Sequence, residues 1–375
     1  MKYYLIAGEA SGDLHGANLM RALREKDSDA QFRFWGGDMM STVGGTPVRH
    51  IRDLAIMGFV EVVAHLGTVL GNISFCKRDI TAWHPDVVIG IDYPGFNLKI
   101  ETWAHKQGFK TVHYISPNLW AWKKGRIKSM RKSLDRLCYI LPFEERFFAE
   151  NNMPQAIYVG HPLLDAVKDH LFEPAFSGKR HVIALLPGSR RQELKKNLPL
   201  MVQLADRHPE YRFIVAGMSL IGKDFYDNLI ETHTKKQASN LSVVYDQTCP
   251  LLASAYAAVV CSGTATLETA LFNVPQIVCY RANPISISIA KAIVSRRIRY
   301  ISLVNLIADN SVVTELIQGD FNPTRLEQEF QLITNNNANR IRIFTQYAHM
   351  RTLIAGSGAS ARTAQAIIQL ITHNS

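Results

Sequence analysis

The sequence predicts an α/β protein with two doubly wound, parallel-sheet (Rossmann-like) domains that face each other across a cleft, followed by a helical C-terminus. Two observations support this fold class. Strand-like apolar runs alternate with helix-like segments, and the alternation breaks near residue 165 and restarts at His181. The runs are continuously apolar, which is typical of parallel strands covered by helices on both faces. Two such sets of β-α-β units indicate two domains rather than one barrel.

Composition sets the broad class of the protein. The chain has 375 residues, of which 47% are hydrophobic and 20% charged, so it is long enough and apolar enough for two globular domains. Its five cysteines form no C-x-x-C pair, which indicates reduced, buried thiols. No run approaches the roughly 20 apolar residues of a spanning helix. The net charge of +10 favours an anionic partner, which could be nucleic acid, a phospholipid surface or a phosphorylated substrate.

The first domain is expected to cover residues 1–164. Helical stretches such as 97–107 and 144–151 separate its strands. The apolar run that ends at Ala7 is too short for a signal peptide and is expected to form the first strand. The expected strands are residues 3–8, 32–36, 87–92, 111–116, 136–141 and 157–160.

The second domain is expected to cover residues 165–355, beginning with a linker at 165–180 that contains Pro174 and Gly178. Its expected strands are residues 181–188, 212–217, 241–246, 257–263 and 276–282, and from about Val312 the chain is expected to be helical with no further strands. Residues 356–375 are expected to form a helix that packs on an N-terminal lobe, of the same chain or of a partner, so a homo-oligomer is possible.

The loops after the first domain's strands carry candidate cleft residues, because ligands bind at the carboxyl ends of parallel strands. Glu9, Ser11 and Asp13 follow the first strand, where Ser11 or Asp13 could equally cap a helix starting near Leu14. The glycines here do not fit G-x-G-x-x-G, and the chain contains no P-loop. Asp92 ends the strand 87–92 and could be a general base or a turn residue.

Two loops of the second domain predict an anion site. The strand 181–188 runs into Gly188, Ser189 and Arg190 before a helix, so free backbone N–H groups and a guanidinium could bind phosphate. The second loop holds small and hydroxyl residues, with Glu268 one turn into the next helix as a possible ribose ligand; its members are Ser262, Gly263, Thr264, Ala265 and Thr266. Helix capping alone could also explain either loop. Two such loops in one domain favour a nucleotide diphosphate.

The ordered motifs resemble those of the lipid-A-disaccharide synthase family over essentially the whole chain. They are Gly8-Glu9-Ala10-Ser11-Gly12-Asp13, Ala55-Ile56-Met57-Gly58-Phe59-Val60-Glu61-Val62, Gly90-Ile91-Asp92, His113-Tyr114-Ile115-Ser116-Pro117 with Trp120-Ala121-Trp122, Leu141-Pro142-Phe143-Glu144, Gly160-His161-Pro162, Leu186-Pro187-Gly188-Ser189-Arg190 and Ser262-Gly263-Thr264-Ala265-Thr266-Leu267-Glu268.

The resemblance implies an inverting glycosyltransferase of the two-lobed GT-B type. It implies UDP-2,3-diacylglucosamine as donor, 2,3-diacylglucosamine 1-phosphate as acceptor, and a β-1,6-linked disaccharide plus UDP as products. It implies Asp92 as the base, and as nucleotide contacts Arg190, the loop 262–266, Glu268 and Asn305. It also implies a protein in the cytoplasm that binds the anionic inner face of the bacterial inner membrane.

Acylated substrates require a lipid-facing surface, and two segments are candidates for it. An apolar stripe recurs at helical spacing, which suits either a core-facing helix or a membrane-facing one; it comprises Phe59, Val62, Val63, Leu66, Val69 and Leu70. Further along, Trp120, Trp122, Lys123 and Lys124 begin a run of cations that continues to Lys132 and could bind anionic headgroups or form a solvated helix face.

Metal and other cofactors are not expected. The only D-x-D, at Asp27 and Asp29, reads as a solvated turn, and no His, Cys or Glu cluster has zinc spacing. Two alternatives remain: another two-lobed UDP-sugar transferase or epimerase, and a non-catalytic nucleic-acid-binding protein. No nucleic-acid-binding motif accompanies the basic run, so nucleic acid is not an expected partner.

Overall fold

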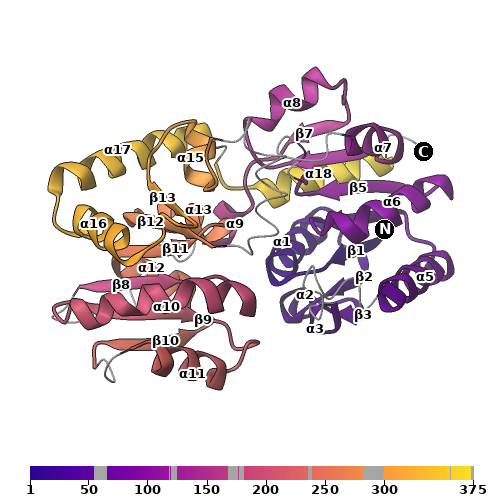
Figure 1. The fold of residues 1–375 in the computed structure, drawn as a ribbon. Coiled ribbons are helices and arrows are strands. Elements are labelled where there is room, and N and C mark those ends of the chain that lie inside the picture. The colour runs from indigo at the N-terminus through magenta and orange to yellow at the C-terminus, as the bar shows by residue number, and fades with distance from the viewer. Residues whose placement is uncertain are drawn as a thin grey trace. The chain divides into compact units, whose positions relative to one another are not determined.

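The computed structural model describes residues 1–54, 66–117, 119, 125–167, 176, 181–234, 239–281, 299–354 and 356–372. The chain divides into two compact units. Unit 1 comprises Met1–Ala166 and Ala355–Ser375, and unit 2 comprises Val167–Ile354. The crossing from unit 1 to unit 2 therefore lies two residues beyond the expected end of the first domain at residue 164. Each unit is built around one parallel sheet (Figure 1).

Unit 1 has a seven-stranded parallel sheet in the order β3-β2-β1-β4-β5-β6-β7. Its strands are β1 (Lys2–Ala7), β2 (Gln31–Gly36), β3 (Thr46–His50), β4 (Val87–Ile91), β5 (Lys110–Tyr114), β6 (Arg136–Tyr139) and β7 (Ala156–Tyr158). The described helices are α1 (Ala10–Lys26), α2 (Asp38–Val43), α3 (Ile51–Leu54), α5 (Leu66–Trp83), α6 (Pro94–Lys106), α7 (Arg126–Ser133), α8 (Glu144–Glu150), α9 (Leu163–Val167), which ends on the unit boundary, and α18 (Ala359–Thr372).

The centre of the sheet in unit 1 is fully buried, as continuous apolar runs predict. Every residue of β4 is buried, and β1 is buried from Tyr3 to Ala7. On one face, Trp35 packs among the apolar residues of α5 and α6 and donates its indole N–H to the hydroxyl of Tyr4 at 2.9 Å. The partly polar Tyr and Trp side chains are therefore satisfied inside the core. This core holds the carboxyl ends of β1 and β4 in a fixed register.

The last helix, α18, returns to unit 1. It packs along α1 and against β5 and β6. The Asp165 carboxylate accepts hydrogen bonds from the backbone N–H groups of Gly358 and Ser360 (2.9 Å for Ser360) and so caps the helix start. Arg362 adds a 2.7 Å bond from Nε to the carbonyl of Val159. The expectation that Asp165 opens a linker was therefore wrong, because this residue belongs to α9 and anchors α18.

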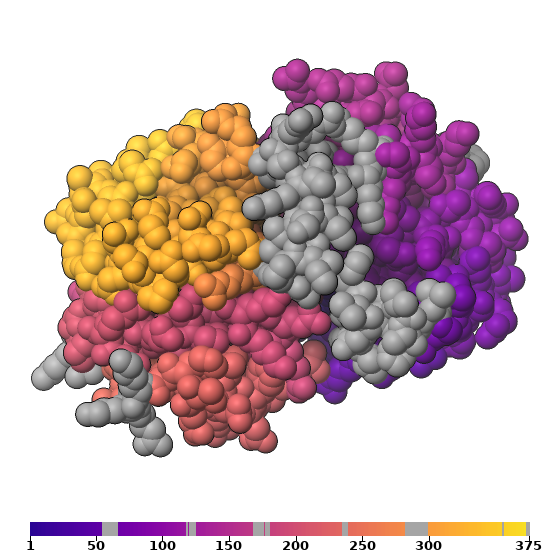
Figure 2. Space-filling model, viewed as in Figure 1, coloured from indigo at the N-terminus to yellow at the C-terminus, as the bar shows by residue number. Residues whose placement is uncertain are grey.

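Unit 2 has a six-stranded parallel sheet in the order β10-β9-β8-β11-β12-β13. Its strands are β8 (Val182–Leu186), β9 (Arg212–Gly217), β10 (Leu241–Tyr245), β11 (Ala255–Cys261), β12 (Gln276–Tyr280) and β13 (Thr314–Ile317). Its described helices are α10 (Arg191–Arg207), α11 (Lys223–His233), α12 (Thr248–Ser254), α13 (Thr264–Leu271), α15 (Leu303–Ala308), α16 (Pro323–Thr334) and α17 (Asn337–Leu353). Figure 2 shows the surface of α16 and α17, in orange to yellow, beside that of α10 in rose.

Two strands were missed from the sequence, and both lie at sheet edges. The expectation of no strand after Val312 was wrong, because β13 covers Thr314–Ile317 and pairs with β12. In unit 1, β3 pairs with β2 although it contains Pro47. An edge strand is paired on one side only and needs neither a continuous apolar run nor every backbone N–H. The periodicity that identifies buried strands is therefore absent from these two.

Candidate functional site

The turn after β4 holds Asp92 in an unusual backbone conformation. Asp92 and Tyr93 both adopt the left-handed region, with φ of 47° and 49°. This region costs a residue with a side chain roughly 1–2 kcal/mol. The turn is held by two hydrogen bonds: Asp92 N–H donates to the carbonyl of Tyr114 (2.8 Å), and Asn97 Nδ2 donates to the carbonyl of Asp92 (2.7 Å). A carboxylate carried by a strained, hydrogen-bonded turn at the carboxyl end of a central strand is typical of a functional site.

The loop after β1 lies against this turn. The backbone of Gly8 contacts the ring of Tyr93 so closely that a Cβ at position 8 would overlap it. Burial, and next the nearby carboxylate of Glu9, raise the pKa of Tyr93. The structure therefore brings Glu9 and the Asp92 turn to one edge of the sheet.

A buried pair of ionisable side chains, His113 and Glu101, lies beneath the turn and was not predicted from the sequence. His113 on β5 and Glu101 on α6 are both fully buried, with 2.8 Å between Nδ1 and Oε1. Burial opposes the charged imidazole, but the Glu101 carboxylate outweighs it, so the pKa of His113 is raised. His113 is the register partner of Gly90, and a side chain at position 90 would overlap Glu101. The glycine inside a strand was the available signal, since such a residue often marks close approach by a neighbouring group.

The other two residues expected after β1 have different positions. Helix α1 begins at Ala10 with Glu9 as its N-cap, so neither Ser11 nor Asp13 caps it. Ser11 is exposed. Asp13 is only 3% exposed, and its carboxylate accepts the backbone N–H groups of Gly37, Met39 and Met40 at 2.6–3.1 Å. Asp13 therefore stabilises the start of α2, and the prediction that it faces a cleft was wrong.

In unit 2, the loop after β8 partly contradicts the predicted anion site. Gly188 takes a φ of 116°, and the following backbone N–H groups of Ser189 and Arg190 both point at Glu193 Oε2, at 3.0 and 3.3 Å. The expected free amides are therefore bound by a carboxylate of the chain itself. The Arg190 side chain is 63% exposed, and its guanidinium Nη1 lies 3.9 Å from Glu193 Oε1. What this loop can offer a phosphate is the Arg190 side chain.

The loop after β11 divides into a buried part and an exposed part. Thr266 is fully buried, and its hydroxyl donates to the carbonyl of Gly263 (2.8 Å). Ser262 donates its hydroxyl to the carbonyl of Ile301 (3.0 Å). These two hydroxyls hold the loop together, and the fully buried Thr266 has no exposed surface for a nucleotide, so its prediction as a direct contact was wrong; that of the half-buried Ser262 stays a prediction. Gly263 and Thr264 are exposed, and Ala265 is half-buried, at the start of α13, whose first N–H groups have no acceptor within the helix.

Two further predicted nucleotide contacts differ in accessibility. Glu268 is half-buried on α13 and accepts a hydrogen bond from Cys249 Sγ at 3.3 Å. Asn305 is 1% exposed and uses its whole amide inside the protein. Its Nδ2 donates to the Val313 carbonyl and to Glu315 Oε1, both at 2.9 Å, and its Oδ1 accepts two backbone N–H groups. The assignment of Asn305 as a nucleotide contact was therefore wrong, since it joins α15 to β13.

Most of the expected lipid-facing residues lie outside the described part of the chain. These are Phe59, Val62, Val63, Trp120, Trp122, Lys123 and Lys124, together with the side chain of Leu66. On α5, Val69 packs against the core of unit 1, whereas Leu70 is 54% exposed. No helix in the described ranges is both long and apolar enough to cross a bilayer. Within the same ranges, no three His, Cys, Asp or Glu side chains converge as metal ligands would.

Known structures share the fold at low sequence identity. A UDP-GlcNAc 2-epimerase from Neisseria meningitidis, bound to UDP-GlcNAc, aligns with a TM-score of 0.68 and 13% identity over 98% of this chain and all of that one. The glycotransferase of kitacinnamycin aligns with a TM-score of 0.65 and 13% identity over 98% of each chain. These likenesses confirm the predicted fold class, two Rossmann-like domains of the GT-B type.

Sequence comparison identifies the family. The family model described as lipid-A-disaccharide synthetase matches residues 3–371. The lipid-A-disaccharide synthase of Acidobacterium capsulatum is 36% identical over 375 residues, covering 96% of this chain and 93% of that protein. That of Chromohalobacter salexigens is 35% identical, covering 100% and 98%. Neither an epimerase nor a nucleic-acid-binding protein is favoured by these matches. The chain belongs to the lipid-A-disaccharide synthase family, as its motifs predicted, and is a glycosyltransferase.

Proposed function

We propose that this protein transfers the sugar of UDP-2,3-diacylglucosamine to the 6-hydroxyl of 2,3-diacylglucosamine 1-phosphate. The anomeric carbon forms a bond to the acceptor oxygen while its bond to the UDP oxygen breaks. The acceptor hydroxyl loses its proton, UDP leaves with the bonding electrons, and inversion of the α-linked donor gives a β-1,6 linkage. The family match over residues 3–371 is the observation that carries this proposal.

Asp92 is proposed as the group that takes the proton. Its position at the carboxyl end of the fully buried strand β4, in a left-handed turn fixed by Asn97 and Tyr114, supports this role. A base held rigidly loses little freedom when the acceptor binds, so its carboxylate can be aligned with the attacking hydroxyl in advance. Glu9, whose loop contacts the same turn, is proposed to line the same edge.

The donor diphosphate is proposed to bind unit 2 through fewer groups than the sequence suggested. The exposed Arg190 guanidinium and the open start of α13, at Gly263, Thr264 and Ala265, remain as contacts. A helix N-terminus and an arginine both stabilise negative charge, which grows on the leaving UDP. Glu268, half-buried on α13, is proposed to bind the ribose hydroxyls.

We also propose that the reaction takes place at a membrane surface. The acyl chains of both substrates and the basic composition suit attachment to the anionic inner face of the bacterial inner membrane, with the exposed Leu70 on the side that enters the lipid. We propose no cofactor beyond the UDP-sugar itself. A homo-oligomer stays a prediction.

The test is an assay of UDP release by the purified full-length chain with the acylated donor, with and without the acylated, phosphorylated acceptor. We expect UDP to appear only when the acceptor is present, together with a product whose mass equals that of the joined sugars. Efficient turnover of UDP-GlcNAc without any acceptor would indicate an epimerase and would contradict the proposal.

A further inference from the structure

Unit 1 contains a groove between α6 and α7 to which nothing so far assigns a role. The two helices lie side by side (Figure 1) and contact each other. The groove has a volume of about 420 Å³, within the range of small-molecule pockets, and is open to solvent. Among the described residues, those that line it all belong to these two helices.

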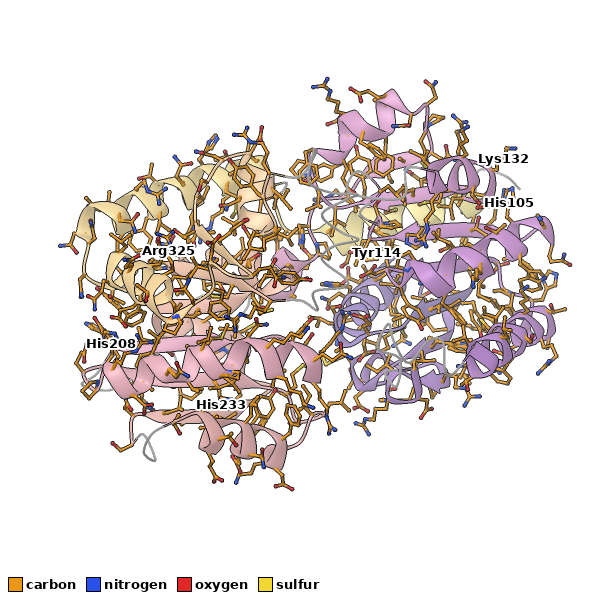
Figure 3. The ribbon with its side chains drawn as sticks, viewed as in Figure 1. His105, Tyr114, Lys132, His208, His233 and Arg325 are labelled. Carbon is orange, nitrogen blue, oxygen red and sulfur yellow. The ribbon has the colours of Figure 1, made fainter. Side chains whose placement is uncertain are left out.

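One end of the groove lies beside the proposed base. Both helices lead into strands of the parallel sheet, α6 into β5 and α7 into β6, so both begin at the carboxyl edge where Asp92 stands. Pro94 and Gly95, the second and third residues after Asp92, line the groove together with Arg126, the first residue of α7. At the other end, Thr102 donates its hydroxyl to Ser133 Oγ at 3.4 Å. Figure 3 marks the far ends of the two helices by His105 and Lys132.

The lining is cationic without compensating acids. Lys99 and Arg126 project from opposite walls, and no Asp or Glu is among the lining residues. Within the described ranges, neither cation has a hydrogen-bond or ion-pair partner. Cations on two sides of an open groove raise the local concentration of anions.

The place of Arg126 in its helix points to function rather than stability. The first turn of α7 contains no acidic residue, and Arg126 occupies its first position. The helix dipole disfavours a cation at that end, and a bound anion would reverse this effect. Leu98 and Met130 add apolar surface to the same lining. The groove therefore suits an anionic group attached to a less polar body, such as a phosphate on a sugar ring.

We infer that the groove between α6 and α7 binds the phosphate of the acceptor, with Lys99 and Arg126 on either side of it. This inference rests on the proposed function, and it names the part of unit 1 that recognises one substrate. The phosphate enters at the Gly95 end, where a Cβ would meet no atom within 4 Å. The sugar ring then extends toward the Asp92 turn, so the charge at position 1 helps to orient the distant 6-hydroxyl. The groove is too small for the acyl chains, which lie elsewhere.

The experiment compares a groove variant with a matched control in the full-length protein. The groove variant combines Lys99→Ala with Arg126→Ala. The control combines Lys106→Ala with Arg78→Ala, which removes one lysine and one arginine from exposed sites on α6 and α5. UDP release is measured with two acceptors that differ only in carrying a phosphate or a hydroxyl at position 1.

We expect the KM for the phosphorylated acceptor to rise about tenfold or more in the groove variant, since charge-assisted bonds to phosphate are among the stronger polar contacts. The donor KM and kcat/KM with the unphosphorylated acceptor should stay near wild type. The control should match wild type with both acceptors. An unchanged KM in the groove variant, an equal loss in the control, or a wild type that does not distinguish the two acceptors would overturn the inference.

A phospholipid headgroup could also supply the phosphate that binds this groove. A vesicle-binding experiment distinguishes a headgroup from the acceptor. Vesicles of phosphatidylglycerol should bind the groove variant and the wild type equally. If the groove variant alone loses vesicle binding, the two cations belong to a membrane surface and the inference is wrong.

Failure of the proposed function is a separate result. If the wild type releases no UDP with either acceptor, the transferase assignment fails, and calorimetry with the acylated sugar phosphate alone still decides the groove. Binding that is lost in the groove variant and kept in the control supports the groove; equal binding by all three proteins overturns it.

Discussion

At the scale of single residues, Asp92 shows what a position in sequence can predict. A polar residue that ends a buried parallel strand must emerge at the ligand-binding edge, and Asp92 does so. The sequence did not predict the left-handed backbone of Asp92 and Tyr93, because neither residue is a glycine. The bonds that hold this turn come from Asn97 and from the carbonyl of Tyr114 on the neighbouring strand.

Asp92→Asn keeps the shape of the side chain and removes its basicity. We expect kcat to fall by roughly 10²–10⁴, the usual contribution of a general base, while the Kd for UDP is unchanged. Asp29→Asn, at an exposed site in the same unit, is the control and should leave both quantities unchanged. Steady-state kinetics and UDP titration measure them. Loss of UDP affinity in the Asp92 variant would make this residue a nucleotide contact instead.

Arg190 and Asn305 illustrate where inference from motifs ends. Arg190 lies in the loop after β8 and Asn305 in helix α15, and both were expected to contact the nucleotide. The structure leaves the Arg190 side chain exposed, whereas Asn305 spends its donors and acceptor on Val312, Val313 and Glu315. Whether a polar side chain faces a ligand or its own backbone depends on tertiary contacts that spacing along one chain does not contain.

Arg190→Ala is expected to raise the donor KM by roughly 10–100-fold, the effect of one or two lost charge-assisted bonds to phosphate. The acceptor KM should be unchanged. Lys223→Ala, which removes an exposed cation from α11 in the same unit, is the control. A donor KM that does not respond to the loss of Arg190 would remove this residue from the site and leave α13 as the anion contact.

At the scale of elements, continuous apolar runs decided which strands could be predicted, including the half-buried edge strands β7 and β10. The interior strands β1, β4, β8 and β11 carry continuous apolar runs and were found. The edge strands β3 and β13 were not, since Pro47 interrupts one and the other is four residues long with half-buried polar positions. The cap at the start of α18 was not predicted either, because Asp165 lies 193 residues from Gly358 and 195 residues from Ser360 in the chain.

Two buried histidines of unit 1, His15 and His161, predict how the free energy of unfolding depends on pH. Burial lowers the pKa of His15 to about 4, with Asp165 acting in the opposite direction. Burial, and then the neighbouring His15, lower the pKa of His161 to about 3. Between these values and 6.5 the unfolded chain binds protons that the folded chain does not, so stability is full above pH 6.5 and falls as the pH decreases. The expected loss from pH 7 to pH 5 is about 2 kcal/mol per histidine.

A histidine variant isolates this effect from an opposing one. Burial raises the pKa of Glu144 to about 8, so its contribution grows as the pH falls from 8 toward 4.5. His161→Asn keeps an acceptor for the N–H of Leu163, which His161 Nδ1 accepts at 3.2 Å, and removes the titrating ring. Urea unfolding followed at pH 7 and pH 5 should show a smaller difference in the variant than in the wild type. An equal difference would mean that His161 does not control the acid sensitivity.

At the scale of the whole molecule, the two units offer different chemistry. Unit 1 contributes the carboxylates Asp92 and Glu9 and the cationic groove, and unit 2 contributes Arg190 and the start of α13. The two-domain organisation followed from the repeated β-α-β alternation, because each parallel sheet requires its own set of buried strands. The net charge of +10 then has a physical reading, since both proposed substrates carry phosphate groups.

Because unit 2 is proposed to bind the diphosphate through protein groups, we expect UDP release not to require a metal ion. If Arg190 and the N–H groups of α13 neutralise the diphosphate, the leaving group needs no divalent cation for its charge. UDP release should therefore proceed at the same rate in excess EDTA as in added Mg²⁺. The Arg190→Ala variant, assayed in parallel, shows whether a cation can replace the lost guanidinium, in which case Mg²⁺ would restore part of its donor affinity. A wild type that stops in EDTA and recovers with Mg²⁺ would show that protein groups alone do not stabilise the departing UDP.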